Sequence, residues 1–267
     1  MIVKVTSNSI IKCDNEYIKH KLIDILNNFI SFYIFKINVE ISIDNKNFNI
    51  KSEDIIQLYY LNLPNNIITN NNINSFLIKF KNYKNSFVFG KGPTFINREK
   101  ENNELYFGVN QTCNILNNCE FFCANDLHNI YKIEDFSKIK YILIPEYLHI
   151  NGEFNKKGYW FQVYEYLKDK FHGDIIIFNL RTCKYKNNQF INIPKCKTTS
   201  NVAVNFICIF LNLYIKKVTT YGVGIICNTN YNKKFIGNGE YKKDRINIIK
   251  NEIIDICNKY NLTLMMK

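Results

Sequence analysis

Hydrophobic and polar positions follow two different patterns along the chain. Up to about residue 82, short alternating stretches surround one long segment of helical spacing. From Phe87 onward, compact apolar runs alternate with amphipathic stretches of helical length. Alternating strands and helices are typical of a mostly parallel sheet with helical crossovers. The pattern therefore predicts an α/β, Rossmann-like doubly wound domain at residues 83–267, preceded by a small α+β domain of unknown role at residues 1–82.

Individual elements follow from the local spacing of apolar residues. In the first part of the chain we expect strands at Ile2–Thr6, Phe35–Ile43 and Phe76–Phe80, helices at Asn15–Tyr33 and Ile55–Leu61, and a loop at Asn65–Asn74. In the second part we expect strands at 86–90, 105–109, 119–123, 141–145, 174–179, 218–222 and 262–266, and helices at 159–170, 201–214 and 244–260.

Composition narrows the class of protein. The chain has 267 residues, of which 46% are hydrophobic and 15% aromatic, so it can bury a core and is not a disordered protein. Abundant Asn, Ile and Lys indicate an AT-rich genome. Since that bias raises the number of lysines, the net charge of +12 says less about function. The basic residues are spread along the chain without a long run, so we do not expect nucleic-acid binding.

Cysteine usage points to a reducing compartment. The nine cysteines include no Cys-x-x-Cys pair, and several lie in apolar runs as small core residues. The sequence has neither an Asp-x-Asp pair nor a zinc-finger spacing of Cys and His, so it does not suggest a metal site. The start of the chain lacks an apolar signal-peptide region, and no apolar stretch reaches the length of a membrane span. We therefore expect a cytoplasmic protein without a membrane span and without a metal.

Polar loops follow four of the predicted strands or open the helix after them. Ligands of open α/β sheets bind outside the carboxyl ends of the strands, where such loops gather. These loops are Gly90-Lys91-Gly92-Pro93-Thr94, Asn110-Gln111-Thr112, Asn125-Asp126 and Lys197-Thr198-Thr199-Ser200-Asn201.

Each loop also has a plain structural interpretation. Two glycines and a proline can form an ordinary turn, and asparagines cap helices and occupy loops in any Asn-rich chain. Thr199 or Ser200 would serve as a helix N-cap whatever the function. The joint occurrence of the loops, rather than any one of them, favours a nucleotide site built from backbone N–H groups and these side chains.

In this order, the loops resemble the motifs of bacterial CMP-sialic-acid-dependent sialyltransferases. That family has Gly-Asn-Gly-Pro-Ser in the first loop, Cys-Asn-Gln at the next strand end, a further Asn, and Arg-x-Thr-Ser-Gly at a helix start. The wider related group includes viral and bacterial glycosyltransferase-like chains and hydroxymethylpterin diphosphokinase-like enzymes. The resemblance covers residues 86–266 and implies a Rossmann-like fold with a nucleotide-activated sugar as donor.

The resemblance also implies roles for individual residues. Asn110 and Asn125 would contact the ribose and phosphates of a cytidine nucleotide, with Gln111 beside them. Ser200, Thr199 and Lys197 would lie near the donor. Lys91 replaces a ligand-binding asparagine within the loop from Gly90 through Gly92 and Pro93 to Thr94, where its charge could meet a phosphate.

Two departures affect the chemistry that the resemblance implies. The family's catalytic histidine follows Ile-Gly, where this chain has Asn238, and asparagine cannot act as a general base. The family's Gly-x-Asp is Gly222-Val223-Gly224 here. We therefore expect His149, in a loop after a strand, or Asp126 to supply the catalytic group. His128 and Glu146 also follow strands, whereas His172 precedes one and is expected to be structural.

The expected function is a glycosyltransferase-like enzyme that uses a nucleotide-activated sugar, with a CMP-linked sugar as the specific case. Its partners would be that nucleotide sugar and a glycan or other hydroxyl acceptor. Two alternatives stay open: an ATP-dependent diphosphotransferase-like enzyme, and a nucleotide-binding protein that has lost catalysis. The sequence fixes neither the acceptor nor the oligomeric state.

Overall fold

The structure is a computed structural model that describes residues 11–13, 39–43, 46–50, 63–150, 153–180, 189–194, 196, 198–223 and 243–267. For residues 11–13, 39–43, 46–50, 147–150, 153–159, 161, 162, 180 and 243–245, only the backbone is described. The expected elements at Ile2–Thr6, Asn15–Tyr33 and Ile55–Leu61 lie outside the described residues, as do Lys197 and Asn238.

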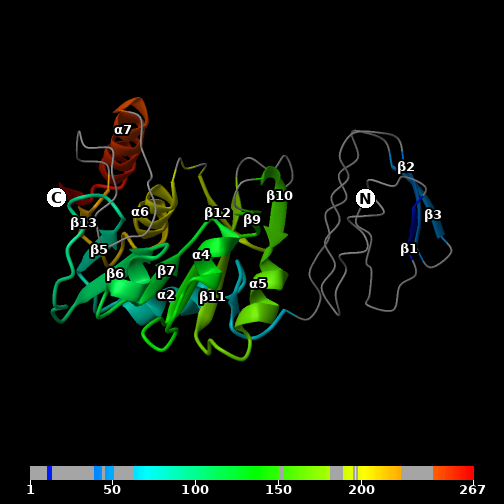
Figure 1. The fold of residues 1–267 in the computed structure, drawn as a ribbon, viewed down its shortest axis with the longest axis horizontal. Coiled ribbons are helices and arrows are strands. Elements are labelled where there is room, and N and C mark those ends of the chain that lie inside the picture. The colour runs from blue at the N-terminus through cyan, green and yellow to red at the C-terminus, as the bar shows by residue number, and fades with distance from the viewer. Residues whose placement is uncertain are drawn as a thin grey trace. The chain divides into compact units, whose positions relative to one another are not determined.

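The chain divides into two compact units (Figure 1). The smaller comprises Met1–Asn65 and Cys183–Gln189. Its described part is an antiparallel sheet in the order β1-β2-β3, formed by β1 (Ile11–Cys13), β2 (Val39–Ile43) and β3 (Lys46–Ile50). The expected strand at Phe35–Ile43 corresponds to β2, and β3 was not predicted.

The larger unit, Asn66–Thr182 and Phe190–Lys267, is built on a nine-stranded sheet. Every described strand pair in this sheet is parallel, and helices alternate with the strands, so the expected Rossmann-like α/β fold is confirmed. Its strands are β4 (Ile67–Ile68), β5 (Asn85–Phe89), β6 (Glu104–Val109), β7 (Phe121–Cys123), β8 (Tyr141–Pro145), β11 (Asp174–Leu180), β12 (Ile191–Ile193), β13 (Lys217–Tyr221) and β14 (Thr263–Met266).

Helices and one hairpin complete the larger unit. The hairpin pairs β9 (Tyr147–Ile150) with β10 (Glu153–Tyr159) in antiparallel fashion. The helices are α2 (Ile73–Leu77), the 3-10 helix η1 (Ile78–Phe80), α3 (Thr112–Ile115), α4 (Leu127–Tyr131), α5 (Trp160–Leu167), α6 (Thr199–Phe210) and α7 (Lys243–Lys259).

Residues 66–82 belong to the larger unit and not to the N-terminal one as expected. Ile67 and Ile68 form β4, which pairs with β11 at Ile175 and Ile176. The segment 76–80 is helical instead of a strand. The spacing of its apolar residues fits both a strand and a helix, but Ile73, Phe76 and Phe80 fall on one helical face and are all buried. Burial of that face in the core favours the helix over the strand.

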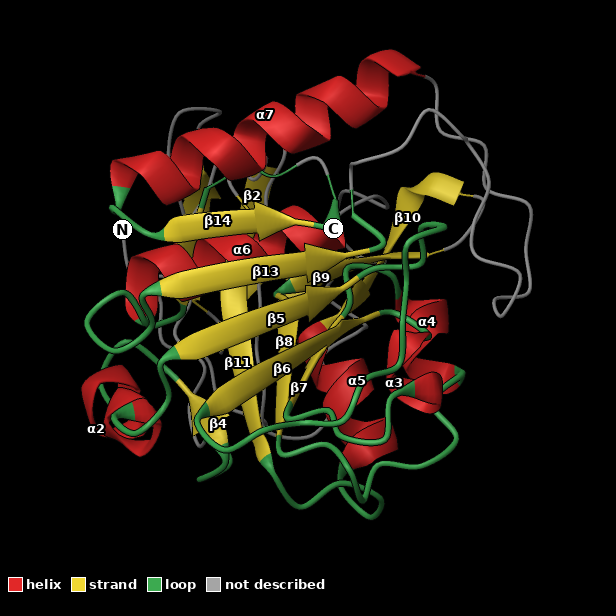
Figure 2. Ribbon diagram, turned by 90° about the vertical axis from the view of Figure 1, so that its left-hand side faces the viewer, coloured by secondary structure: helices red, strands yellow, loops and turns green. Residues whose placement is uncertain are grey.

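Both faces of the large sheet are covered, so its central strands are buried along their whole length. All six residues of β6 are buried. One face packs against α2, α6 and α7 through Val88, Phe107, Phe121, Phe206, Ile253 and their neighbours. In Figure 2, α7 lies alongside β14, with which it makes contact. Ten consecutive residues of α6, Thr199–Cys208, are buried, because this helix lies between the sheet and α7.

An aromatic cluster occupies the opposite face at β5, β6 and β13. The rings of Phe89 and Tyr221 stack with centroids 5.6 Å apart. Tyr106 packs on Phe89 at 5.0 Å, and the Arg98 guanidinium lies 4.5 Å from the centroid of the Phe87 ring. Such contacts stabilise beyond the area that they bury. They hold the three strands together just before the loops that follow them.

The order of the strands reverses next to β5. From β5 the chain adds β6, β7, β8, β11 and β12 on one side, and then returns through α6 to place β13 and β14 on the other side. The arrowheads of β13, β5 and β6 point the same way in Figure 2, so the loops after them lie at one edge. In open α/β sheets this reversal is where ligands bind.

Three glycines allow the loops after β5 and β13 to touch at this reversal. The Gly90 N–H donates to the Tyr221 carbonyl and the Gly92 N–H to the Gly222 carbonyl, both at 2.8 Å. A Cβ on Gly90 or Gly92 would lie 2.6 Å from the Gly222 oxygen. Gly222 has φ +66°, and a Cβ there would lie 2.3 Å from the Gly90 oxygen. The glycines are thus required by contact between two protein backbones.

We expect Gly222→Ala to destabilise the protein by about 2 kcal/mol or more, because alanine is strained at this φ and its methyl overlaps the Gly90 carbonyl. Urea unfolding measures the change. Leu213→Ala, at an exposed position on the same unit, serves as the control and should change the free energy of unfolding by less than about 0.5 kcal/mol. An alanine at residue 222 that is as stable as the wild type would contradict the loop contact.

Candidate site at the carboxyl edge of the sheet

Hydrogen bonds within the protein fix the conformation of the loop after β5. Thr94 Oγ1 accepts a hydrogen bond from the Gly222 N–H at 2.9 Å and donates one to the Lys267 carbonyl at 2.8 Å. Since the N–H groups of Gly90 and Gly92 also bond to carbonyls of the protein, neither is left to bind a phosphate. What this loop offers a ligand is the side chain of Lys91, which is partly buried, rather than a cradle of N–H groups.

The loop after β6 is tied to both neighbouring strands. Asn110 has φ +56°, a conformation that asparagine tolerates better than most residues, and its N–H donates to the Cys123 carbonyl at 2.9 Å. Thr112 Oγ1 lies 3.0 Å from the carbonyl oxygens of Phe89 and Val109. Gln111 occupies the N-cap position of α3 and is partly exposed. These bonds place the Asn110 side chain beside the end of β7.

The loop after β7 leads directly into α4 and brings four polar residues together. Asn125 and Asp126 follow Ala124, and Asp126 occupies the N-cap position of α4 without making a side-chain capping bond. Asn129 Nδ2 donates to Asp126 Oδ2 at 3.3 Å. His128 lies between them in sequence and is partly buried. The predicted residues Asn110, Asn125 and Asp126 therefore follow adjacent strands.

Among the described residues, the buried polar atoms without a hydrogen-bond partner include Thr220 Oγ1 in β13 and four atoms in the loops after β6 and β7 and in α4. These four are Asn110 Oδ1, Asn125 Oδ1, His128 Nδ1 and Asn129 Oδ1. Because Asn129 Nδ2 is engaged by a carboxylate, exchanging the oxygen and nitrogen of that amide would lose a hydrogen bond, which fixes its orientation. An unsatisfied buried polar atom costs about 1–3 kcal/mol, so ordered water or a ligand is needed to supply the missing partners at this edge.

Charged side chains surround this group of atoms. Burial lowers the pKa of Lys91; the Asp126 carboxylate opposes the shift and Lys132 adds to it. Burial also lowers the pKa of His128; Asp126 again opposes, and Lys132 and Lys91 reinforce the shift. Lys91, Asp126, His128 and Lys132 therefore influence one another electrostatically. The group comprises two lysines, one carboxylate and an imidazole whose pKa lies below its ordinary value.

The start of α6 is capped differently from the expectation. Thr198, rather than Thr199 or Ser200, is the N-cap, and its hydroxyl oxygen accepts a hydrogen bond from the Asn201 N–H at 3.3 Å. Thr199 and Ser200 lie in the first helical turn and are buried. Asn201 Nδ2 bonds to Glu252 of α7, so this end of α6 is fixed against α7. Lys197, which was expected near the donor, lies outside the described residues.

His149 lies in β9 of the hairpin, not in a loop as expected. The backbone pairs His149 with Lys157, and β9 packs against α4, which carries His128. Glu146, which directly follows β8, is buried. The hairpin was not predicted, because Glu153–Tyr159 contains consecutive lysines that interrupt the strand alternation.

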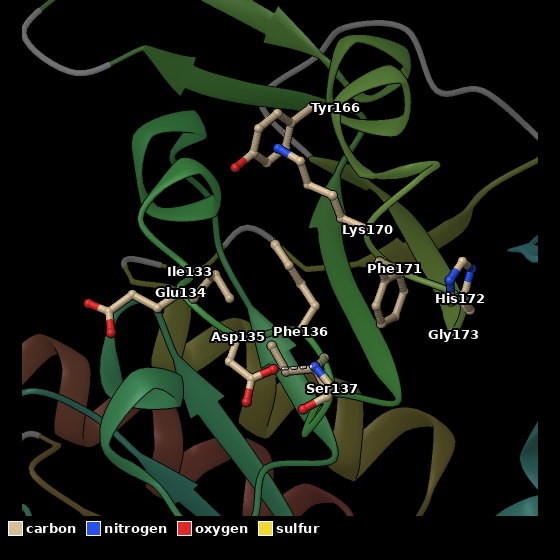
Figure 3. A pocket seen from close by; sticks show the side chains of 11 residues that line it. Ile133, Glu134, Asp135, Phe136, Ser137, Tyr166, Lys170, Phe171, His172 and Gly173 are labelled. Atoms are coloured by element: carbon tan, nitrogen blue, oxygen red, sulfur yellow. Dashed lines mark hydrogen bonds between the residues drawn. The ribbon is translucent and has the colours of Figure 1, made fainter.

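A surface cavity of about 640 Å³ lies at the opposite, amino edge of the sheet (Figure 3). It is lined by residues that precede β8 and β11, including Phe136, Phe171 and His172. In Figure 3, Lys170 extends over the ring of Tyr166, and Asp135 accepts a hydrogen bond from the Ser137 N–H. His172 thus lies at this edge, away from the loops that follow the strands.

Among the residues that the structure describes, no three His, Cys, Asp or Glu side chains are arranged to hold a metal ion. Among the helices of these segments, none is long and apolar enough to cross a membrane. Comparison with known proteins finds no matching family model and no significant match among curated proteins or solved structures. The site must therefore be interpreted from its own chemistry.

Lys91 should make stability depend on pH in a defined direction. Because burial lowers its pKa below the ordinary value of 10.5, the unfolded chain binds more protons than the folded chain between the lowered pKa and 10.5. Stability from this group therefore rises with pH across that window. We expect Lys91→Met to remove this rise and to raise the free energy of unfolding at pH 7, measured by urea unfolding from pH 7 to pH 10.5.

The control is Lys81→Met, which replaces an exposed lysine. This variant should keep the pH dependence of the wild type. A Lys91→Met protein with the same pH dependence as the Lys81→Met protein would show that Lys91 pays no burial cost in the folded state.

Proposed function

We propose that the chain is a nucleotide-binding, glycosyltransferase-like enzyme that transfers a sugar from a nucleotide-activated donor to a hydroxyl acceptor. A CMP-linked sugar is the specific donor that we propose. The observation that supports the proposal is the pair of unpartnered oxygens on Asn110 and Asn125 at the ends of adjacent strands. They lie at the edge where the strand order reverses, which is where open α/β sheets bind nucleotides.

The chemistry of the loops suits the two halves of a nucleotide. Carboxamide oxygens accept hydrogen bonds, so Asn110 and Asn125 suit the hydroxyls of a ribose or the amino group of a base. Lys91 and Lys132 are cations that would attract phosphates, and the partial burial of Lys91 strengthens such an interaction. Binding a dianionic phosphate would also favour the charged form of Lys91, whose burial is otherwise costly.

The resemblance to sialyltransferases in the sequence supports the same proposal independently of the geometry. It connects the loop containing Lys91, the Asn110-Gln111 pair and Asn125 to a donor nucleotide. Diphosphate transfer from ATP is the alternative within the same group, and it normally needs Mg²⁺ held by carboxylates. Asp126 and Glu146, which follow adjacent strands, are the carboxylates that could serve it.

Isothermal titration calorimetry with CMP, UMP, AMP and Mg²⁺-ATP tests the proposal. We expect CMP to bind, and Asn110→Ala and Asn125→Ala each to weaken binding about tenfold, since each removes one acceptor worth about 1.4 kcal/mol. Asn118→Ala, which changes an exposed asparagine between the two loops, is the matched control and should bind as the wild type does.

Two results would count against the proposal. Absence of binding by every nucleotide would remove its basis, as would binding that neither asparagine variant changes. A preference for Mg²⁺-ATP over CMP would replace it with the diphosphotransferase alternative.

A further inference from the structure

His128 is a neutral histidine in the group of unpartnered atoms at the carboxyl edge. It lies in the first turn after Asp126, and its Nδ1 is buried without a hydrogen-bond partner. A buried ring nitrogen of this kind is costly in a protein that folds for stability alone. The residue as a whole is nevertheless partly exposed, which leaves part of its surface open to a ligand.

The surroundings of His128 favour proton uptake during a reaction and not before it. Burial, Lys132 and Lys91 keep the imidazole neutral, which is the form that can accept a proton. Asp126 acts in the opposite direction and would stabilise the imidazolium once it forms. A general base needs both conditions: a free lone pair at rest and a counter-charge after transfer.

The other charged and titratable groups around α4 come from several elements. Lys91 comes from the loop after β5, and Lys132 follows α4. The strand β9, which packs against α4, carries Tyr147 and His149. The helix α5 contributes Tyr166, whose ring packs on Tyr131 with centroids 4.7 Å apart. Of these groups, the two lysines and Asp126 are the ones that shift the pKa of His128.

We infer that His128 is the residue that takes the proton of the acceptor hydroxyl, an inference that rests on the proposed function. The acceptor oxygen bonds to the anomeric carbon of the donor sugar while its proton passes to the imidazole. The bond between that carbon and the phosphate oxygen breaks, and its electron pair leaves with the phosphate. Lys91 and Lys132 balance the charge that develops on the departing phosphate. Asp126 is a positioning residue that stabilises the imidazolium.

The experiment compares His128→Gln with His172→Gln, since His172 lies at the opposite, amino edge of the sheet. CMP affinity is measured by calorimetry, and turnover as CMP released from CMP-sialic acid with lactose as acceptor, from pH 5 to pH 9. Thermal unfolding checks that each variant folds.

We expect His128→Gln to bind CMP within about threefold of the wild type and to lose about 10²–10⁴-fold in kcat. The wild-type rate should fall as the pH is lowered through the range in which His128 is protonated, and this fall should disappear in the variant. His172→Gln should keep the wild-type pH profile and a kcat within a few fold. Replacing a side chain that has only a structural role would not remove the fall in rate at acidic pH.

Several outcomes would overturn the inference. They are a His128→Gln enzyme with wild-type kcat, a wild-type rate that does not fall at acidic pH, and CMP binding by the wild type without turnover. The last outcome leaves the nucleotide-binding part of the proposed function intact. Failure of the wild type to bind any nucleotide contradicts the proposed function itself, so the two failures are distinguishable. If His128→Gln does not fold, the wild-type pH profile still decides.

Discussion

The contact between the loops after β5 and β13 is the constraint on which the candidate site depends. Where the order of parallel strands reverses, as it does beside β5, the loops on the two sides normally diverge and open a crevice. Here Gly90, Gly92 and Gly222 bring the two backbones together, and Thr94 adds a hydroxyl bridge. The base of the crevice is thereby closed, and the polar groups that can meet a ligand lie on the side of β6 and β7. In the proposed function, the loop positions Lys91, and Asn110 and Asn125 recognise the nucleotide.

The same edge shows how stability and function diverge in this protein. The sheet is buried on both faces and held by aromatic packing around Phe89, so the strands behind the loops have a well-defined position. At their carboxyl ends, the protein keeps a partly buried lysine and several buried acceptors without partners. Rigid strands that present destabilising polar groups are characteristic of sites that a ligand completes.

The sequence predicted most of the fold and some of the residues that lie at the carboxyl edge of the sheet. Long apolar runs marked β5, β6, β8 and β11 because both faces of these strands are buried. Short strands were not predicted: β4 consists of Ile67 and Ile68 within an Asn-rich stretch, and β12 is only Ile191–Ile193. The order of the loops indicated Asn110 and Asn125. It could not show that the Gly90 and Gly92 N–H groups are already bonded, or that Asn129 shares the site, because both depend on contacts between elements.

The most direct measurement of the central claim is a crystal structure of the protein soaked with CMP. The account predicts the nucleotide at the carboxyl edge of the sheet, with hydrogen bonds to the Asn110 and Asn125 oxygens and its phosphate on the side of Lys91. A nucleotide bound instead in the amino-edge cavity beside Phe136 and Phe171, or contacts at the carboxyl edge that involve neither asparagine, would contradict it.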